Sequence, residues 1–313
     1  MNKSTKIRLN YLFGITLSVV LLYSLYQQVA QQLESVDLTQ LFQSQAEYFL
    51  MITLLLMPVN LMIEGYKWKV LVNSAQTTSY GQAFASVLGG VALSIITPNR
   101  IGELPGRILY MQRKNTIRLI SVAILSAFTQ FFTLFLFGIA GLVYYNRHNP
   151  GNWQGIVLSA AVLILLFIAI VFFRFEDWAR RFEHLRWLRK FNTYNALMQR
   201  FTRREQLNVL GLSILRFLVF TAQYLLLLRW MNIPLSFSEG LFTAFLFFWA
   251  IAVIPSFALA ELGIRGQVSL FLFHNFSNNT MGILVATLGL WFINLVIPAL
   301  VGSVMLIRMR WLR

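Results

Sequence analysis

The stretch TPNRIGELPGRILY, residues Thr97–Tyr110, decides how the chain folds because it breaks off a run of small and apolar residues. It contains two prolines, two glycines, two arginines and one glutamate where a membrane helix would otherwise continue. Backbone that leaves helical geometry at membrane depth is tolerated only where protein buries it or where it lines a water-filled cavity. The stretch therefore predicts a turn beside a polar cavity inside a membrane domain.

The composition supports a membrane protein and argues against a soluble one. Hydrophobic residues make up 58% of the chain and charged residues only 12%. A net charge of +15 could suggest nucleic-acid binding, but the Lys and Arg residues lie in bursts between apolar runs. Such bursts are typical of topology determinants and of anchors for anionic lipid headgroups. We therefore expect membrane lipids as partners and no nucleic acid. The absence of cysteine excludes disulfides and Cys-ligated metals.

Long apolar runs predict an all-α polytopic integral membrane protein that forms one membrane domain, residues 1–313. A hydrocarbon core is about 30 Å thick, which a helix of about 20 residues crosses. The runs long enough to cross are Tyr11–Val29, Tyr48–Val70, Ile117–Tyr145, Gly155–Phe173, Leu207–Trp230 and Met281–Ile307. Two shorter runs, Ala83–Thr97 and Leu241–Ile254, end in proline, glycine and charge. The sequence therefore predicts six full spans and two further elements of another kind.

The distribution of basic residues predicts the orientation of these spans. Lys3, Lys6 and Arg8 flank the first span on its N-terminal side, whereas the loop 30–47 carries acids and no basic residue. Because cytoplasmic loops carry the excess of Lys and Arg, both termini are expected in the cytoplasm. The bias also argues that Ala83–Thr97 does not cross the membrane. We expect it to turn near Pro98 and return.

The chain thus divides into two halves that resemble each other in opposite orientations. The first half, 1–173, contains a re-entrant helical hairpin at 81–112 on the cytoplasmic side. The second half, 207–313, contains another at 239–274 on the outer side. A basic amphipathic connector, 174–206, joins them and is expected to lie at the membrane surface.

The tips of the two hairpins share a pattern. They read PNRIGELPGR, from Pro98 to Arg107, and PSFALAELGIR, from Pro255 to Arg265. Each begins with proline after an apolar run, reaches a Glu-Leu pair, and has arginine four residues after the glutamate. In transporters with inverted-topology repeats, the binding site forms where the repeats meet. Both tips are therefore expected to line one central cavity.

The charges at the tips allow two interpretations. An ionised residue costs roughly 2.5–3.5 kcal/mol at membrane depth on insertion scales. In one interpretation, Glu103 with Arg107 and Glu261 with Arg265 are ion pairs that only neutralise each other. In the other, the arginines bind an anionic group, for which phosphate matches the planar guanidinium. The glutamates would then tune the arginines or carry a proton.

The second interpretation predicts which residues bind substrate. Arg216 joins the candidates because it lies within the fifth span, too far from the end of that span to reach the membrane surface easily. The residues predicted to bind substrate are Arg100, Glu103, Arg107, Arg216, Glu261 and Arg265. The residues predicted to form the turns are Pro98, Gly102, Pro105, Gly106, Pro255, Gly263 and Gly266.

Other polar residues are expected to be structural. Glu64, Lys67 and Asn60 near the end of the second span are interpreted as an interfacial polar group near the cytoplasm. The residues expected to make helix-to-helix hydrogen bonds are Gln130, Gln223 and Asn294. The three histidines lie far apart without ligand spacing, so neither a metal nor another cofactor is expected.

Both tips also resemble those of a known family. TPNRIGELPGR resembles the signature of the flippase-like membrane family that includes the transmembrane domain of lysylphosphatidylglycerol synthase. IPSFALAELGIRG occupies the place of that family's second turn, with its Gly-x-Arg element. The resemblance spans nearly the whole chain and implies a lipid translocase of two inverted repeats. The residues that it carries over are Pro98, Arg100, Gly102, Glu103, Pro255, Gly263 and Arg265.

The resemblance has one departure and leaves two functions to compare. The family often has glutamate after the second arginine, where this chain has Gly266, and Glu261 occupies a place more often filled by glycine. We expect a flippase for an anionic phospholipid or a polyprenyl-linked lipid, in the bacterial cytoplasmic (inner) membrane. The alternative is a membrane-embedded transferase that uses Glu103 and Glu261 as base and acid. Transport is favoured because the sequence shows neither a nucleophile nor a metal site for chemistry. No segment resembles the soluble aminoacyl-transfer domain of the synthases, so lipid aminoacylation is not expected.

Overall fold

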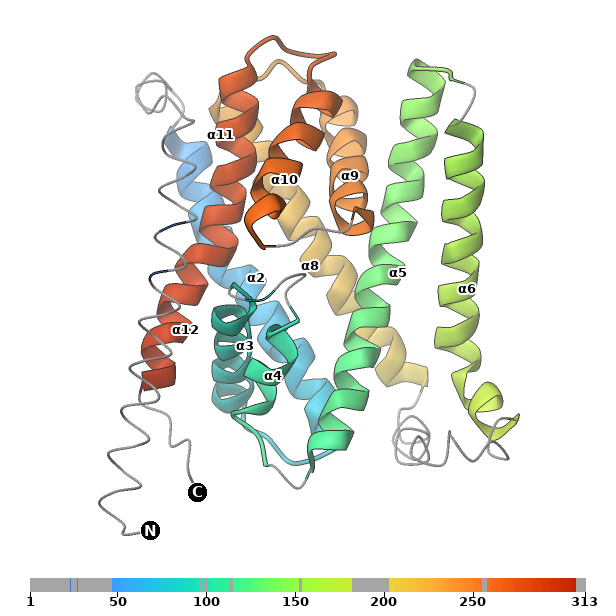
Figure 1. The fold of residues 1–313 in the computed structure, drawn as a ribbon, viewed down its shortest axis with the longest axis vertical. Coiled ribbons are helices and arrows are strands. Elements are labelled where there is room, and N and C mark those ends of the chain that lie inside the picture. Colours follow the sequence, from blue (N-terminus) through green and yellow to red (C-terminus); the bar gives the residue numbers. More distant parts are fainter. Residues whose placement is uncertain are drawn as a thin grey trace.

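The computed structural model describes a bundle of helices (Figure 1). It describes residues 23, 27, 47–95, 97, 101–112, 115–151, 154–181, 203–254 and 258–307. Among these residues there is no strand. The helices are α2 (Glu47–Asn73), α3 (Tyr80–Ser94), α4 (Glu103–Ile108), α5 (Thr116–His148), α6 (Gln154–Arg181), α8 (Arg203–Trp230), α9 (Phe237–Val253), α10 (Ala258–Phe273), α11 (Thr280–Trp291), the π-helical η5 (Phe292–Val296) and α12 (Ile297–Ile307). The predicted all-helical fold class is confirmed.

Five segments of the described chain are long and apolar enough to cross a membrane. They are Glu47–Asn73, Arg118–His148, Gln154–Phe172, Arg203–Trp230 and Thr280–Leu306. Each coincides with one of the predicted long apolar runs. The two shorter runs also form helices, α3 and α9, and neither is among the five.

Two parts of the sequence prediction fall largely outside the described residues. Of the predicted first span, Tyr11–Val29, only residues 23 and 27 are described. Of the connector 174–206, the segment 182–202 is not described. In the described beginning of the connector, α6 continues as a helix from the span Gln154–Phe172 through Arg181.

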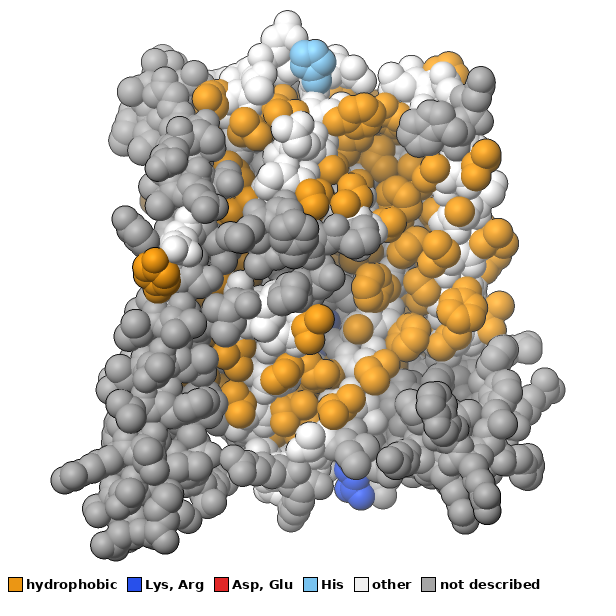
Figure 2. Space-filling model, viewed as in Figure 1, with side chains coloured by type: hydrophobic (Ala, Val, Ile, Leu, Met, Phe, Trp, Pro, Cys, Tyr) orange, Lys and Arg blue, Asp and Glu red, His pale blue; other side chains and the backbone are white. Residues whose placement is uncertain are grey.

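The outer surface of the bundle suits a lipid environment. Figure 2 shows hydrophobic side chains gathered over α5 and α6. On α6, Ile156, Leu163 and Phe167 are each more than 60% exposed. Such exposure would be costly in water, whereas lipid tails are as apolar as these side chains. Exposed apolar residues and five long apolar helices together indicate an integral membrane protein.

Two helical pairs point toward each other from opposite ends of the bundle. Figure 1 shows α3–α4 at one end and α9–α10 at the other, with their inner ends near mid-height. Each pair begins at a serine cap, because Ser79 accepts a hydrogen bond from the Gln82 amide and Ser236 accepts one from the Glu239 amide. The inner ends meet at one hydrophobic cluster, which includes Ile95 of the first pair and Leu262 of the second.

Several residues expected in the turns lie in helices instead. Pro105 and Gly106 belong to α4, and Gly263 and Gly266 to α10, while Gly102 caps the N-terminus of α4. Proline is tolerated in the first turn of a helix because the amide that it lacks has no partner there. Pro98 and Pro255 lie outside the described residues.

Gly106 has a packing role in this arrangement. A Cβ at Gly106 would lie 2.6 Å from the Gly89 carbonyl oxygen and 2.7 Å from the Gly90 Cα. Both are backbone atoms of α3, which cannot move aside as the end of a flexible side chain could. The absence of a side chain at Gly106 therefore lets α4 lie directly against α3.

The last span serves both helical pairs. It runs through α11, η5 and α12, and its first part packs on α10 and α8 while α12 packs on α3. The π-helical segment Phe292–Val296 separates these two parts. Trp291 and Leu295 lie in the hydrophobic cluster where the inner ends of the pairs meet.

Candidate functional site

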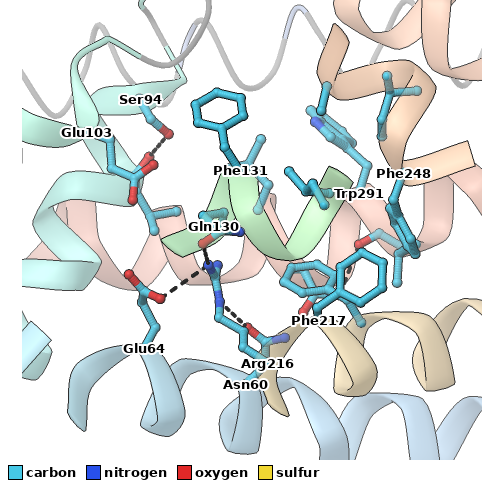
Figure 3. Close-up of a pocket in the computed structure, with 18 of the residues that line it drawn as sticks. Asn60, Glu64, Ser94, Glu103, Gln130, Phe131, Arg216, Phe217, Phe248 and Trp291 are labelled. Atoms are coloured by element: carbon cyan, nitrogen blue, oxygen red, sulfur yellow. Dashed lines mark hydrogen bonds and ion pairs between the residues drawn. The ribbon is translucent and has the colours of Figure 1, made fainter. Parts of the chain in front are cut away.

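A cavity of about 570 Å³ lies where the two helical pairs meet. Its walls come from both pairs and from the long helices α2, α5, α8 and α11. Figure 3 shows charged and amide side chains on one side of it and aromatic side chains on the other. The polar residues that line it are Asn60, Glu64, Ser94, Glu103, Arg107, Gln130, Arg216, Arg265 and Asn294. The aromatic residues are Phe131, Phe217, Phe220, Phe248 and Trp291.

Glu64 of α2 is the centre of the charged side. Its Oε1 atom accepts a hydrogen bond of 2.7 Å from Arg107 Nη2. Its Oε2 atom lies 3.0 Å from Lys67 Nζ and 3.2 Å from Arg216 Nη1. Because Glu64 is only 2% exposed, these three cations compensate a carboxylate that the bundle has removed from solvent.

The interpretation of Glu64 and Lys67 as a polar group at the membrane interface needs correction. The two residues do form an ion pair, but Lys67 is 0% exposed and Glu64 also binds arginines from α4 and α8. Helix α2 continues to Asn73, well beyond Glu64, and α3 packs over it. The pair is therefore buried within the bundle.

Arg107 of α4 is held from several directions. Its Nη2 atom pairs with Glu64 and also with Glu103 one turn earlier on its own helix. The guanidinium lies 5.0 Å from the centre of the Trp68 ring, a cation–π contact. Trp68 Nε1 donates to the Ser86 hydroxyl, which in turn donates to the Arg107 carbonyl, each over 2.8 Å. These contacts fix α4 and its arginine against α2 and α3.

Glu103 differs from Glu64 in its access to the cavity. The Glu103 side chain is 35% exposed, whereas that of Glu64 is 3% exposed. Glu103 does form an ion pair with Arg107, as one of the two interpretations of the sequence expected. It is not isolated, however, because Arg107 also bridges to Glu64.

Arg216 of α8 reaches the same cluster from the opposite side. Its Nε atom donates to Asn60 Oδ1 and its Nη1 atom to Gln130 Oε1, both over 3.1 Å. Its guanidinium also lies 5.3 Å from the centre of the Phe220 ring. Three helices that are distant in sequence, α2, α5 and α8, thus meet at this arginine.

The cluster has a positive balance beside an apolar wall. Lys67, Arg107 and Arg216 carry three positive charges, and Glu64 and Glu103 carry two negative ones. One net positive charge in low-dielectric surroundings favours an anion. The aromatic wall opposite suits an apolar group. The arrangement can therefore hold a molecule with one anionic part and one apolar part.

The comparison with known proteins agrees with these features. Residues 11–312 match the family described as the lysylphosphatidylglycerol synthase TM region. The chain belongs to this family. No curated protein and no solved structure matches it. Membership of the lysylphosphatidylglycerol synthase TM-region family indicates a membrane protein related to lipid handling.

The structure brings together four of the six residues that the sequence predicts to bind substrate. Glu103, Arg107, Arg216 and Arg265 all line the cavity. Arg100 lies outside the described residues. Glu261 lies in α10, but its side chain is also outside the described part of the chain.

Sequence reasoning did not assign Glu64, Asn60 and Gln130 to the site. One signal could have found the first two, because Asn60, Glu64 and Lys67 follow one another at four- and three-residue steps on a single face of α2. Gln130 gave no such signal, since its polar neighbours on α5 are Ser126, Thr129 and Thr133, whose small hydroxyl side chains are common in membrane helices.

The three amides expected to connect helices differ in what they do. Gln223 of α8 donates to the Thr53 carbonyl of α2 over 3.0 Å, so this prediction is confirmed. Asn294 donates to Leu290 in its own helix. Gln130 does connect helices, but it does so as part of the charged cluster.

Proposed function

We propose that this protein is a flippase-like transporter that moves an anionic phospholipid or a polyprenyl-linked lipid between the two leaflets. The observation that carries the proposal is the central cavity, which has a net positive cluster on one side and an aromatic wall on the other. In this proposal, the cluster binds the anionic headgroup and the aromatic wall faces the apolar chain.

The two opposed helical pairs support transport across the whole membrane. We propose that α3–α4 and α9–α10 are re-entrant hairpins of an inverted repeat, entering from the cytoplasmic and the outer side respectively. Transporters with such repeats place the substrate near the bilayer midplane, where the repeats meet, and rock one part against the other. The cavity lies at the corresponding place here, between the inner ends of both pairs. The positive-inside bias supports a cytoplasmic location for both termini, and the proposed location is the bacterial inner membrane.

The side of the cavity offers a route for lipid. Phe131 of α5 and Val253 of α9 both line the cavity, and they are 45% and 46% exposed, so the cavity is not closed over at these residues. A lipid whose headgroup enters the cavity can therefore keep its acyl chains in the bilayer beside these residues. The cavity volume fits a headgroup better than a whole lipid, which agrees with such partial entry.

Transport is better supported than group transfer. The transferase alternative needs an acid, a base and a nucleophile close together. Among the described residues that line the cavity, the single hydroxyl group is that of Ser94, which donates to the Val91 carbonyl. Glu103 is engaged by Arg107.

Reconstitution tests the proposal. The protein would be placed in phosphatidylcholine vesicles containing labelled phosphatidylglycerol, and leaflet exchange would be followed by chemical quenching of the label in the outer leaflet. We expect faster exchange of phosphatidylglycerol than in protein-free vesicles. Mass analysis of the same lipids would detect any modified product. Formation of a modified lipid without leaflet exchange would refute the flippase proposal and support the transferase alternative.

A further inference from the structure

Two neutral amides flank the Arg216 guanidinium in the cavity. Asn60 of α2 lies on one side and Gln130 of α5 on the other (Figure 3). Each presents its oxygen to the arginine over 3.1 Å. Both residues line the cavity.

The cations fix the direction in which the amides point. Arginine and lysine N–H groups only donate, so the atom that faces them must be the amide oxygen. The Gln130 oxygen accepts from Lys67 Nζ at 3.5 Å in addition to Arg216. The amino groups of Asn60 and Gln130 are therefore directed away from the arginine.

Among the residues that the structure describes, the amino group of Asn60 has no hydrogen-bond partner, although the residue is only 2% exposed. A buried donor without a partner is rare and costs free energy, so it calls for an explanation. Within the described ranges, Gln130 Nε2 and Arg216 Nη2 likewise have no hydrogen-bond partner. Three side chains from three helices thus offer N–H donors around one cavity.

We propose that Asn60, Gln130 and Arg216 form a binding site for a phosphate group. The three donors suit oxygens that only accept, and the guanidinium neutralises the charge. Glu64 holds Arg216 in position at 3.2 Å. The proposal deepens the proposed function, on which it rests, by assigning the lipid phosphodiester to this α2–α5–α8 wall and not to the tips of the helical pairs.

The net charge of the cluster adds selectivity to this site. A phosphodiester alone does not distinguish phosphatidylglycerol from phosphatidylcholine, because both contain one. The adjacent Lys67 and Arg107 leave the cluster positive, so a choline group is repelled where a glycerol group is tolerated. The site therefore prefers an anionic lipid.

Isosteric variants test the site. Asn60→Asp keeps the oxygen that accepts from Arg216 but replaces the free donor by an oxygen that repels phosphate. We expect binding of glycerol 3-phosphate to purified protein, measured by calorimetry, to weaken about tenfold or more. Phosphatidylglycerol exchange in vesicles should slow similarly, and thermal stability should be equal or higher because the contact with Arg216 becomes an ion pair. Gln130→Glu gives a second, independent test at a less buried position.

A matched control removes an amide elsewhere on α8. Gln223→Leu loses a helix-to-helix bond outside the cavity, so it should lower stability without changing glycerol phosphate binding. If Asn60→Asp and Gln130→Glu both bind glycerol phosphate as the wild type does, the phosphate site is refuted.

The two measurements separate the possible sources of the phosphate group. Loss of both binding and exchange in the variants supports a lipid phosphodiester. Loss of binding with unchanged exchange supports the phosphate site but assigns it to a free phosphate compound. A wild-type protein that binds glycerol phosphate but exchanges no lipid would refute the proposed function while leaving the site standing.

Discussion

The helical pairs α3–α4 and α9–α10 begin alike, each at a serine cap, but they are held in different ways where they meet the cavity. The first pair is fixed by charge and close packing. Its Arg107 bridges to Glu64 of α2, and its Gly106 lies against the backbone of α3. Movement of α4 away from α2 would break a buried ion pair.

The second pair presents a looser, mainly apolar surface to the same cavity. Residues 251–254 at the end of α9 line it with aliphatic side chains, and Arg265 is the charged residue among its described lining residues. A Cβ at Gly263 of α10 would meet nothing within 4 Å. We propose that, in the transporter inferred above, the first pair is a fixed support for the headgroup site and the second is the part able to move.

The largest expected effect is that of Glu64→Gln. Three cations contact this carboxylate, so its neutralisation leaves buried positive charges without compensation. We expect a loss of about 3–5 kcal/mol of unfolding free energy, or failure to obtain folded protein. Thermal unfolding followed by tryptophan fluorescence measures this. Glu47→Gln, at the exposed start of α2, is the control and should change little. Equal stability of both variants would show that the first pair is not held by charge.

A smaller effect separates the packing of the two pairs. Gly106→Ala places a methyl group 2.6 Å from a backbone oxygen of α3, and we expect a cost of about 1–3 kcal/mol. Gly263→Ala fills open space inside α10 and should leave stability equal or raise it by up to about 1 kcal/mol, because alanine favours a helix over glycine. The same thermal measurement compares the two. Equal destabilisation by both substitutions would contradict the proposed contrast in packing.

The hydrogen bonds at the start of α9, which is the end of the second pair away from the cavity, are expected to contribute about 1 kcal/mol to the free energy of unfolding. Ser236 and Glu239 exchange hydrogen bonds in a capping box at the start of α9. Ser236→Ala removes the side-chain acceptor, so stability should fall by about 1 kcal/mol. Lipid exchange should stay at the wild-type rate, since the cap lies outside the cavity lining. A large loss of exchange without loss of stability would show that this end takes part in transport directly.

The smallest expected effect concerns the exposed carboxylate of the first pair. Glu103 competes with an anionic headgroup for the positive charge of the cluster as a whole, because it is a 35% exposed carboxylate paired with one of the cluster's cations, Arg107. A partly exposed pair contributes little, so Glu103→Gln should tighten glycerol 3-phosphate binding only about two- to fivefold. Calorimetry would measure the change. Weaker binding in this variant would show that Glu103 helps to hold the anion and does not compete with it.

Much of the described fold follows from patterns that are local in sequence. Hydropathy located five spans because a helix that faces lipid must be apolar along its length, whatever it packs against. Proline after the apolar run explains where α9 stops, since Val253 lies two residues before Pro255. The glycines were harder to interpret, because proline and glycine also mark turns. Only the close approach of α4 to α3 in space shows that Gly106 serves close packing inside a helix.

The charged cluster could be predicted only in part. An arginine in a broken apolar run or deep within a long one is conspicuous, so Arg107 and Arg216 are predicted from the sequence. Glu64 was missed because a glutamate three residues from a lysine near a span's end is as compatible with a surface pair as with a buried one. What distinguishes the two is the position of α3 and α4 over α2, which depends on long-range packing.

The widened turn of η5 has a consequence for how one span can join the two pairs. A π-helical turn holds an extra residue relative to an α-helix, and one residue corresponds to about 100° of rotation around the axis. The side chains of α12 are therefore out of phase with those of α11, which allows α11 to face α10 and α12 to face α3. Without that offset, the helix would present one continuous stripe to a single neighbour. An extra residue thus lets one continuous span pack against both helical pairs.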